Sequence, residues 1–155
     1  MRGTFTKKNI TIFFSFDEII MDNNLANFVE HKMIDKDSAV EDWYLHFSLI
    51  QVAYYSALAR KIDKFYTAKF RINQGFEKQT LHIKNNIKRQ NTLIFTCDGE
   101  SVSYNVECLN DKKIIKFYLN KINSTDDYDT AKEWDQKFKF NEWKYLNKYI
   151  KYNKI

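Results

Sequence analysis

Glycine and proline are scarce in this chain: its 155 residues include three glycines, at positions 3, 75 and 99, and no proline. Loops that cradle phosphate groups need clustered glycines, because only a residue without a side chain lets the backbone approach the ligand closely. The three glycines lie far apart in the sequence. The sequence therefore excludes a P-loop, a glycine-rich dinucleotide-binding loop and the nucleophile elbow of hydrolases.

Cysteine and histidine are also scarce, with two cysteines (Cys97 and Cys108) and three histidines. Two cysteines do not make the disulfide framework of a small secreted protein, and together with the histidines they never reach zinc-ligand spacing. The acidic cluster Asp126, Asp127 and Asp129 lacks the glycine and the distal glutamate of an EF-hand loop. We therefore expect no metal and no cofactor, and we expect a reducing, cytoplasmic location.

Long apolar runs are the third absence. The longest, Ile10 to Phe16, is far shorter than the roughly 20 residues that span a bilayer, and no secretory leader pattern precedes it. We therefore expect no membrane association. Hydrophobic residues nevertheless make up 44% of the chain and aromatic residues 17%, which is ample material for a core. The length fits one domain, which we expect to span residues 1–155.

The first half of the chain predicts a strand, a helix and a hairpin. Residues 9–16 alternate as a strand, with Ile10, Ile12, Phe14 and Phe16 on one face and Phe13 on the other. Residues 17–33 indicate a short helix or two turns. A capping box of Ser38 and Glu41 then opens the strongest helix of the sequence. Its apolar stripe recurs at steps of three and four: Val40, Trp43, Phe47, Ile50, Tyr54, Leu58, Ile62 and Phe65. From Tyr66 the period changes to two, which predicts a strand with Tyr66 on its apolar face, a loop at 73–75 and a second strand at 78–85.

The second half predicts a meander and a final helix. The Asp98-Gly99 pair is a strong two-residue hairpin signal, and Asn110-Asp111 indicates a second tight turn. The first turn pairs Cys97 with Glu100, Phe95 with Val102, and Leu93 with Tyr104. The second turn predicts a further strand with Ile115, Phe117 and Leu119 on the same apolar face. The two cysteines would then lie too far apart for a disulfide.

The C-terminal segment, from about residue 129, predicts helical structure, with a last helix over 141–152 and an apolar stripe of Trp143, Leu146 and Ile150. The predicted fold is therefore α+β. A long amphipathic helix packs on an antiparallel meander of four or five strands, and a C-terminal helix closes the domain.

Basic residues gather between positions 60 and 89. This stretch contains nine Lys and Arg residues but only two acidic residues, Asp63 and Glu77. The whole chain has a net charge of +5. A candidate nucleic-acid surface comprises Lys69, Arg71, Lys84, Lys88 and Arg89. The alternative, which we prefer, is a solvated sheet face whose lysines prevent edge-to-edge aggregation. His82 beside these cations also permits a small metal-independent ribonuclease, which needs an acid–base group and a cation for the phosphate.

The last helix carries a second candidate surface, in which lysines and tyrosines alternate. Its members are Tyr145, Lys148, Tyr149 and Tyr152. Tyrosine is enriched where proteins bind one another. Because no catalytic constellation is present, the leading hypothesis is a non-enzymatic protein-binding module of bacterial or viral origin, of the inhibitor, immunity or accessory-subunit type. Nucleic-acid binding through the 60–89 surface and ribonuclease activity are the alternatives.

Overall fold

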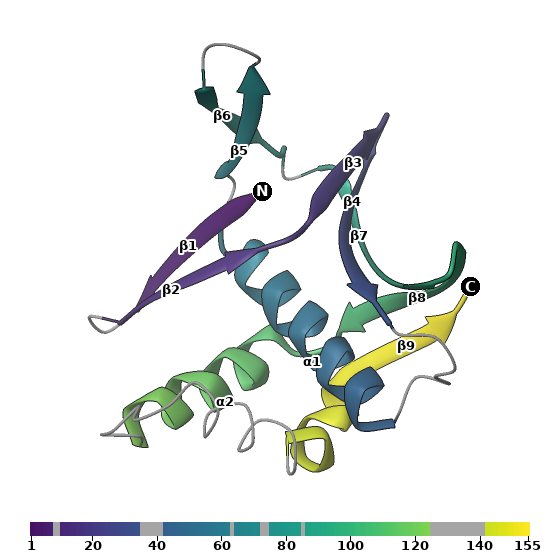
Figure 1. Cartoon of the computed structure of the whole chain (residues 1–155). Helices are drawn as coiled ribbons and strands as arrows, with labels where there is room; N and C mark the ends of the chain where they lie inside the picture. Colours follow the sequence, from purple (N-terminus) through teal and green to yellow (C-terminus); the bar gives the residue numbers. More distant parts are fainter. Residues whose placement is uncertain (8–9, 35–41, 63, 72–74, 85, 125–141) are drawn as a thin grey trace.

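Figure 1 shows the computed structural model of the chain. The structure describes residues 1–7, 10–34, 42–62, 64–71, 75–84, 86–124 and 142–155, with residues 10, 68–71, 75–77 and 121–124 described through their backbone alone. Two sheets, of four and five strands, enclose a long helix. The predicted α+β class is confirmed.

The four-stranded sheet is antiparallel throughout and has the order β2-β1-β5-β6. Its strands are β1 (Arg2–Lys7), β2 (Ile10–Ser15), β5 (Lys64–Arg71) and β6 (Gly75–His82). Figure 1 shows the β5–β6 hairpin projecting from the body of the molecule. This sheet therefore combines the N-terminus with the middle of the chain.

The five-stranded sheet has the order β3-β4-β7-β8-β9. Its strands are β3 (Glu18–Asp22), β4 (Leu25–Met33), β7 (Lys88–Cys97), β8 (Glu100–Cys108) and β9 (Ile150–Lys154). The pair β4–β7 is parallel, and the remaining pairs are antiparallel. The parallel pair is possible because the long connection through α1, β5 and β6 separates these two strands in the sequence.

Helix α1 (Asp42–Ala59) forms the centre of the core and contacts α2, β2, β7, β8 and β9. Ile50, Tyr54 and Leu58 of the predicted stripe are buried, whereas Trp43 remains 44% exposed. The predicted cap, Ser38 and Glu41, lies outside the described residues. The helix ends at residue 59 instead of 65, because 3₁₀-type hydrogen bonds from the amides of residues 61 and 62 tighten its last turn.

Residues 17–33 form the β3–β4 hairpin, so the predicted short helix is wrong. The turn residue Asn23 adopts a φ of 45°. Asparagine tolerates this left-handed conformation, and the Asn23-Asn24 pair is the turn signal that the helix assignment overlooked. Cross-strand partners such as Ile19 with Phe28 then place apolar side chains on the face that packs against the core.

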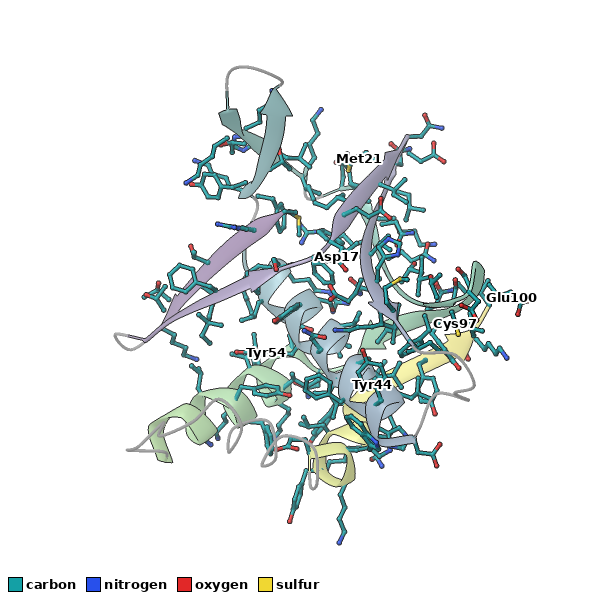
Figure 2. The ribbon with its side chains drawn as sticks, viewed as in Figure 1. Asp17, Met21, Tyr44, Tyr54, Cys97 and Glu100 are labelled. Atoms are coloured by element: carbon teal, nitrogen blue, oxygen red, sulfur yellow. The ribbon has the colours of Figure 1, made fainter. Side chains whose placement is uncertain are left out.

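The hairpin at Asp98-Gly99 is confirmed, with the predicted pairs Cys97–Glu100, Phe95–Val102 and Leu93–Tyr104. Asp98 and Gly99 adopt φ values of 49° and 81°, as a type I′ turn requires. Figure 2 shows Cys97 and Glu100 at the tip of this hairpin. Neither this cysteine nor Cys108 is in a disulfide.

The predicted second turn at Asn110-Asp111 is wrong, because helix α2 (Asp111–Ser124) begins there. The Asn110 Oδ1 atom accepts a hydrogen bond from the Lys113 amide at 3.2 Å and so caps the helix. Ile114, Ile115, Tyr118 and Leu119 are buried at helical spacing. The Tyr118 ring packs 3.9 Å from that of Tyr54 on α1. The third strand beside β8 is supplied instead by the C-terminus.

The C-terminal helix is shorter than predicted. Residues 142–146 are helical, the 3₁₀ helix η1 (Asn147–Tyr149) follows, and the chain then continues as β9. Leu146 and Ile150 are buried as the stripe requires. The placement of Tyr152 on a helix is wrong, since it pairs with Val106 across the β8–β9 ladder. The expected helix from residue 129 lies largely outside the described residues.

Candidate functional site

One face of the four-stranded sheet is exposed across all four strands. Arg2 on β1 lies opposite Ser15 on β2 and opposite Tyr66 on β5, and Tyr66 in turn lies opposite Thr80 on β6. Directly opposed residues share a face, and alternate residues along each strand return to it. We call this side the outer face. Its described members, all exposed, are Arg2, Thr4, Thr6, Thr11, Phe13, Ser15, Lys64, Tyr66, Lys78, Thr80 and His82.

The other side of β1, β2 and the start of β5 packs against the core and fixes the orientation of the sheet. Gly3, Phe14 and Phe65 are buried there. The Phe14 ring lies 6.0 Å from that of Tyr55 on α1, and the Phe65 ring lies 5.5 Å from that of Phe28 on β4. A slip of one residue in register would expose these rings, so the burial of the inner side determines which residues face outward.

The charge on the outer face has one sign. Arg2, Lys64 and Lys78 are its cations, and no carboxylate occurs among its described members. Within the described part of the chain, ion pairs involve Glu18, Glu30 and Asp111, which all lie on other elements. The cations of the outer face therefore keep their full donor capacity for a ligand.

Two aromatic rings accompany these cations. Phe13 is 76% exposed and Tyr66 is 48% exposed. The sequence places Phe13 on the polar face of its strand, which the structure confirms, but the predicted apolar position of Tyr66 is wrong. Phe65 takes the buried place instead, because α1 ends earlier than predicted and β5 begins at Lys64.

The five residues of the predicted basic surface are divided among β5, the segment after β6, and β7. Lys69 and Arg71 lie on β5, opposite residues 77 and 75, in the stretch described through its backbone alone. Lys84 is exposed after β6, and Lys88 is exposed at the start of β7. Arg89 is half-buried, and its Nη1 atom donates a hydrogen bond of 2.9 Å to the Ala59 carbonyl at the end of α1.

The predicted tyrosine–lysine surface extends over a helical turn, η1 and β9. Tyr145 is 60% exposed and Tyr152 is 37% exposed. The Lys148 Nζ atom lies 5.1 Å from the centre of the Tyr149 ring. The ring of Tyr152 also packs 5.9 Å from that of Trp143, so this residue contributes to the fold as well as to the surface.

His82, the candidate ribonuclease residue, is exposed on the outer face at the end of β6, opposite Lys64. An acid–base pair would need a second proton-transfer group nearby. Among the described outer-face residues, its ionisable neighbours are cations. His82 can therefore contact phosphate, but no carboxylate among the described outer-face residues completes an acid–base pair with it.

A buried polar cluster lies between β4 and α1. The Lys32 Nζ atom donates a 2.6 Å hydrogen bond to Gln51 and lies 3.4 Å from the Glu30 carboxylate. Burial raises the pKa of Glu30, and the nearby ammonium of Lys32 opposes this shift. Glu30 is 8% exposed, and Figure 2 shows Tyr44 on the neighbouring helix. Burial, followed by the negative charge of Glu30, raises the pKa of Tyr44 as well. The contacts of Lys32 connect β4 to α1.

Among the described residues, no three His, Cys, Asp or Glu side chains gather closely enough to hold a metal ion. No helix in the described ranges is long and apolar enough to cross a membrane. No family model matches this chain, and neither a curated protein nor a solved structure matches it.

Proposed function

We propose that this protein binds nucleic acid on the outer face of its four-stranded sheet. The observation that carries the proposal is the combination of exposed cations with the absence of carboxylates across the described outer face. Contacts with the phosphate backbone supply most of the affinity of non-specific nucleic-acid binding. The net charge of +5 supports the same partner, because a positive protein attracts a polyanion over long distances.

Arg2 is the most central cation of the outer face. Arg2 lies on β1, which is an inner strand of the sheet, while Lys64 and Lys78 lie on the neighbouring hairpin. Arginine binds phosphate with a planar, bidentate group, and threonine and serine hydroxyls donate further hydrogen bonds to phosphate oxygens. The buried residues Gly3, Phe14 and Phe65 behind β1, β2 and the start of β5 hold Arg2 and Lys64 in place, and Lys78 lies further out on the projecting hairpin (Figure 1). This proposal moves the expected contacts from Arg89, which secures the end of α1, to Arg2, Lys64 and Lys78.

The number of cations sets the expected salt dependence. Three phosphate contacts predict a slope of log affinity against log salt of about −2.1 to −2.7. Affinity should then fall about 20- to 40-fold between 50 and 200 mM salt. Such a fall is modest, as expected for a small surface with few charges.

The test is fluorescence anisotropy with a labelled oligonucleotide, performed over a salt series. The variant Lys64→Glu/Lys78→Glu reverses two outer-face charges. The matched control Lys112→Glu/Lys116→Glu reverses two exposed charges on α2 and changes the net charge equally. We expect the first variant to lose most of its binding and the control to retain it within about three-fold, since only long-range attraction changes there. Equal losses in both variants, or undetectable binding by the wild type, would refute the proposal.

Protein binding through the C-terminal segment is the second candidate function. The supporting observation is Tyr145, a large aromatic side chain that is 60% exposed. Aromatic anchors dominate the binding energy of protein interfaces. A purified partner should then lose affinity for Tyr145→Ala but not for Phe13→Ala, which alters the outer face. We place both functions in the cytoplasm.

A further inference from the structure

We infer that the outer face selects single-stranded nucleic acid, and that Phe13 and Tyr66 stack on its unpaired bases. This inference rests on the nucleic-acid binding proposed above and adds the class of strand that the site accepts. Its starting point is the exposure of these two rings, 76% for Phe13 and 48% for Tyr66. Both rings lie on the same face as the cations Arg2, Lys64 and Lys78. A ligand that combines negative charge with flat aromatic groups would therefore contact both the cations and the rings.

The positions of the two rings fit an extended strand. Phe13 on β2 lies opposite Thr4, and Tyr66 on β5 lies opposite Arg2, with β1 between them. The two positions are therefore two strands apart and offset by two residues. At the usual strand spacing and rise, their Cα atoms are separated by about 12 Å. A single strand that crosses the sheet can reach both rings while Arg2, between them, binds its phosphates.

A single strand can contact both the cations and the aromatic rings of this face, whereas a duplex can contact only the cations. In a duplex the faces of the bases are covered by their stacked neighbours, so exposed rings gain no contact and only the phosphates remain available. In a single strand every base offers a face to an aromatic ring, and each such contact strengthens binding by about 5- to 150-fold. Because every base has such a face, the expected sequence preference is weak.

An anionic membrane surface is the competing partner for a basic and aromatic face. Binding to a bilayer requires a continuous apolar surface that enters the boundary with the acyl chains. On the outer face, however, hydroxyl side chains separate the two rings, among them Thr4 and Ser15. The face therefore favours separate stacking contacts over insertion into lipid.

The experiment compares three probes on the full chain by anisotropy and by vesicle sedimentation. The probes are a labelled 12-nucleotide single strand, the same sequence as a duplex, and phosphatidylserine-containing vesicles. We expect the wild type to bind the single strand about ten-fold or more tightly than the duplex. Phe13→Ala and Tyr66→Ala should each lose about 5-fold or more in affinity for the single strand and less than about two-fold for the duplex.

Three further variants separate stacking from other effects. Phe13→Tyr keeps a ring and should retain wild-type affinity, whereas Phe13→Leu keeps apolar area without a ring and should behave like Phe13→Ala. Tyr145→Ala removes a ring that lies away from the four-stranded sheet and is 60% exposed, a value between those of Phe13 and Tyr66, and it should leave affinity unchanged. Salt slopes should stay unchanged in all of these variants, because no charge is altered.

The outcomes distinguish stacking on single strands from the nucleic-acid binding on which it rests. Equal affinity for single strand and duplex, unaffected by the alanine variants, would overturn the stacking inference and leave nucleic-acid binding intact. Absence of binding to either oligonucleotide would overturn both. Co-sedimentation with the vesicles that competes with the single strand and is lost in Phe13→Ala would assign the rings to a membrane surface and would also overturn the inference.

Discussion

Gly3→Ala is expected to destabilise the protein, although alanine is ordinarily the better residue in a strand. Gly3 is buried on the inner side of β1, and Phe14, its partner across the ladder, covers it with its ring. A Cβ atom there would lie 2.7 Å from Phe14 Cε1, closer still to Phe14 Cζ, and 2.8 Å from Ile62 Cδ1. The backbone of Gly3 is outside the left-handed region, so the expected penalty is purely steric.

The magnitude follows from two opposing effects. Overpacking of a well-packed core costs about 1–3 kcal/mol. Loss of glycine's freedom in the unfolded chain returns about 0.4–1 kcal/mol. The Ile62 methyl can rotate away, but Phe14 is 3% exposed and confined by the core. We therefore expect the free energy of unfolding to fall by about 1–2 kcal/mol.

Urea denaturation followed by circular dichroism measures this loss. Thr4→Ala is the matched control, because its side chain lies on the exposed outer face and the change should stay within about 0.5 kcal/mol. In a Phe14→Leu background, where the ring is removed, Gly3→Ala should cost at least about 1 kcal/mol less than in the wild type. A stabilising effect of Gly3→Ala, or an equal cost in both backgrounds, would show that Phe14 does not pack on Gly3.

Three further predictions concern buried and half-buried groups. Burial raises the folded-state pKa of Glu30 above its ordinary value of 4.5, so ionising this carboxylate costs more free energy in the folded chain than in the unfolded chain. The free energy of unfolding should therefore fall as pH rises from about 4.5 through the raised pKa. Glu30→Gln should flatten this fall in urea titrations between pH 4 and 7, and an unchanged pH profile would contradict the assignment. Burial raises the pKa of Cys108 to about 12, so a thiol reagent at pH 8 should modify the half-buried Cys97 first, and Cys97→Ser should leave a chain that reacts only on unfolding. Arg89→Ala removes the donor at the end of α1 and should lower the free energy of unfolding by about 1–2 kcal/mol while oligonucleotide affinity stays within about two-fold, whereas a selective loss of affinity would return this residue to the binding surface.

Local signals in the sequence predicted the parts of the fold that local chemistry determines. The Asp98-Gly99 pair predicted both the turn and the register of β7 and β8. A two-residue type I′ turn needs positive φ at both residues, and an Asp-Gly pair is one of the few that tolerate it. The alternation around Phe13 predicted its outward position, since only one parity buries the remaining apolar residues of that strand.

Failures arose where two periods fit the same residues. In α2, Ile115, Phe117 and Leu119 alternate as a strand would, yet Ile114, Ile115, Tyr118 and Leu119 also form a helical stripe, and the hydrogen bond to Asn110 favours the helix. The pairing of β8 with β9 joins residues more than forty positions apart in the sequence, so no local sequence pattern predicts it. The outer face was missed for the same reason, because β1 and β5 meet only in the folded sheet.

The most direct test of the central claim is a titration of the isotope-labelled protein with a short single-stranded oligonucleotide, followed by amide chemical shifts. The account predicts that the largest shifts fall on β1, β2, the Lys64–Thr67 part of β5 and the Lys78–His82 part of β6, while β8 and β9 remain nearly unchanged. The shifts should disappear in Lys64→Glu/Lys78→Glu. Shifts concentrated on the C-terminal segment around Tyr145, with the four-stranded sheet unaffected, would contradict it.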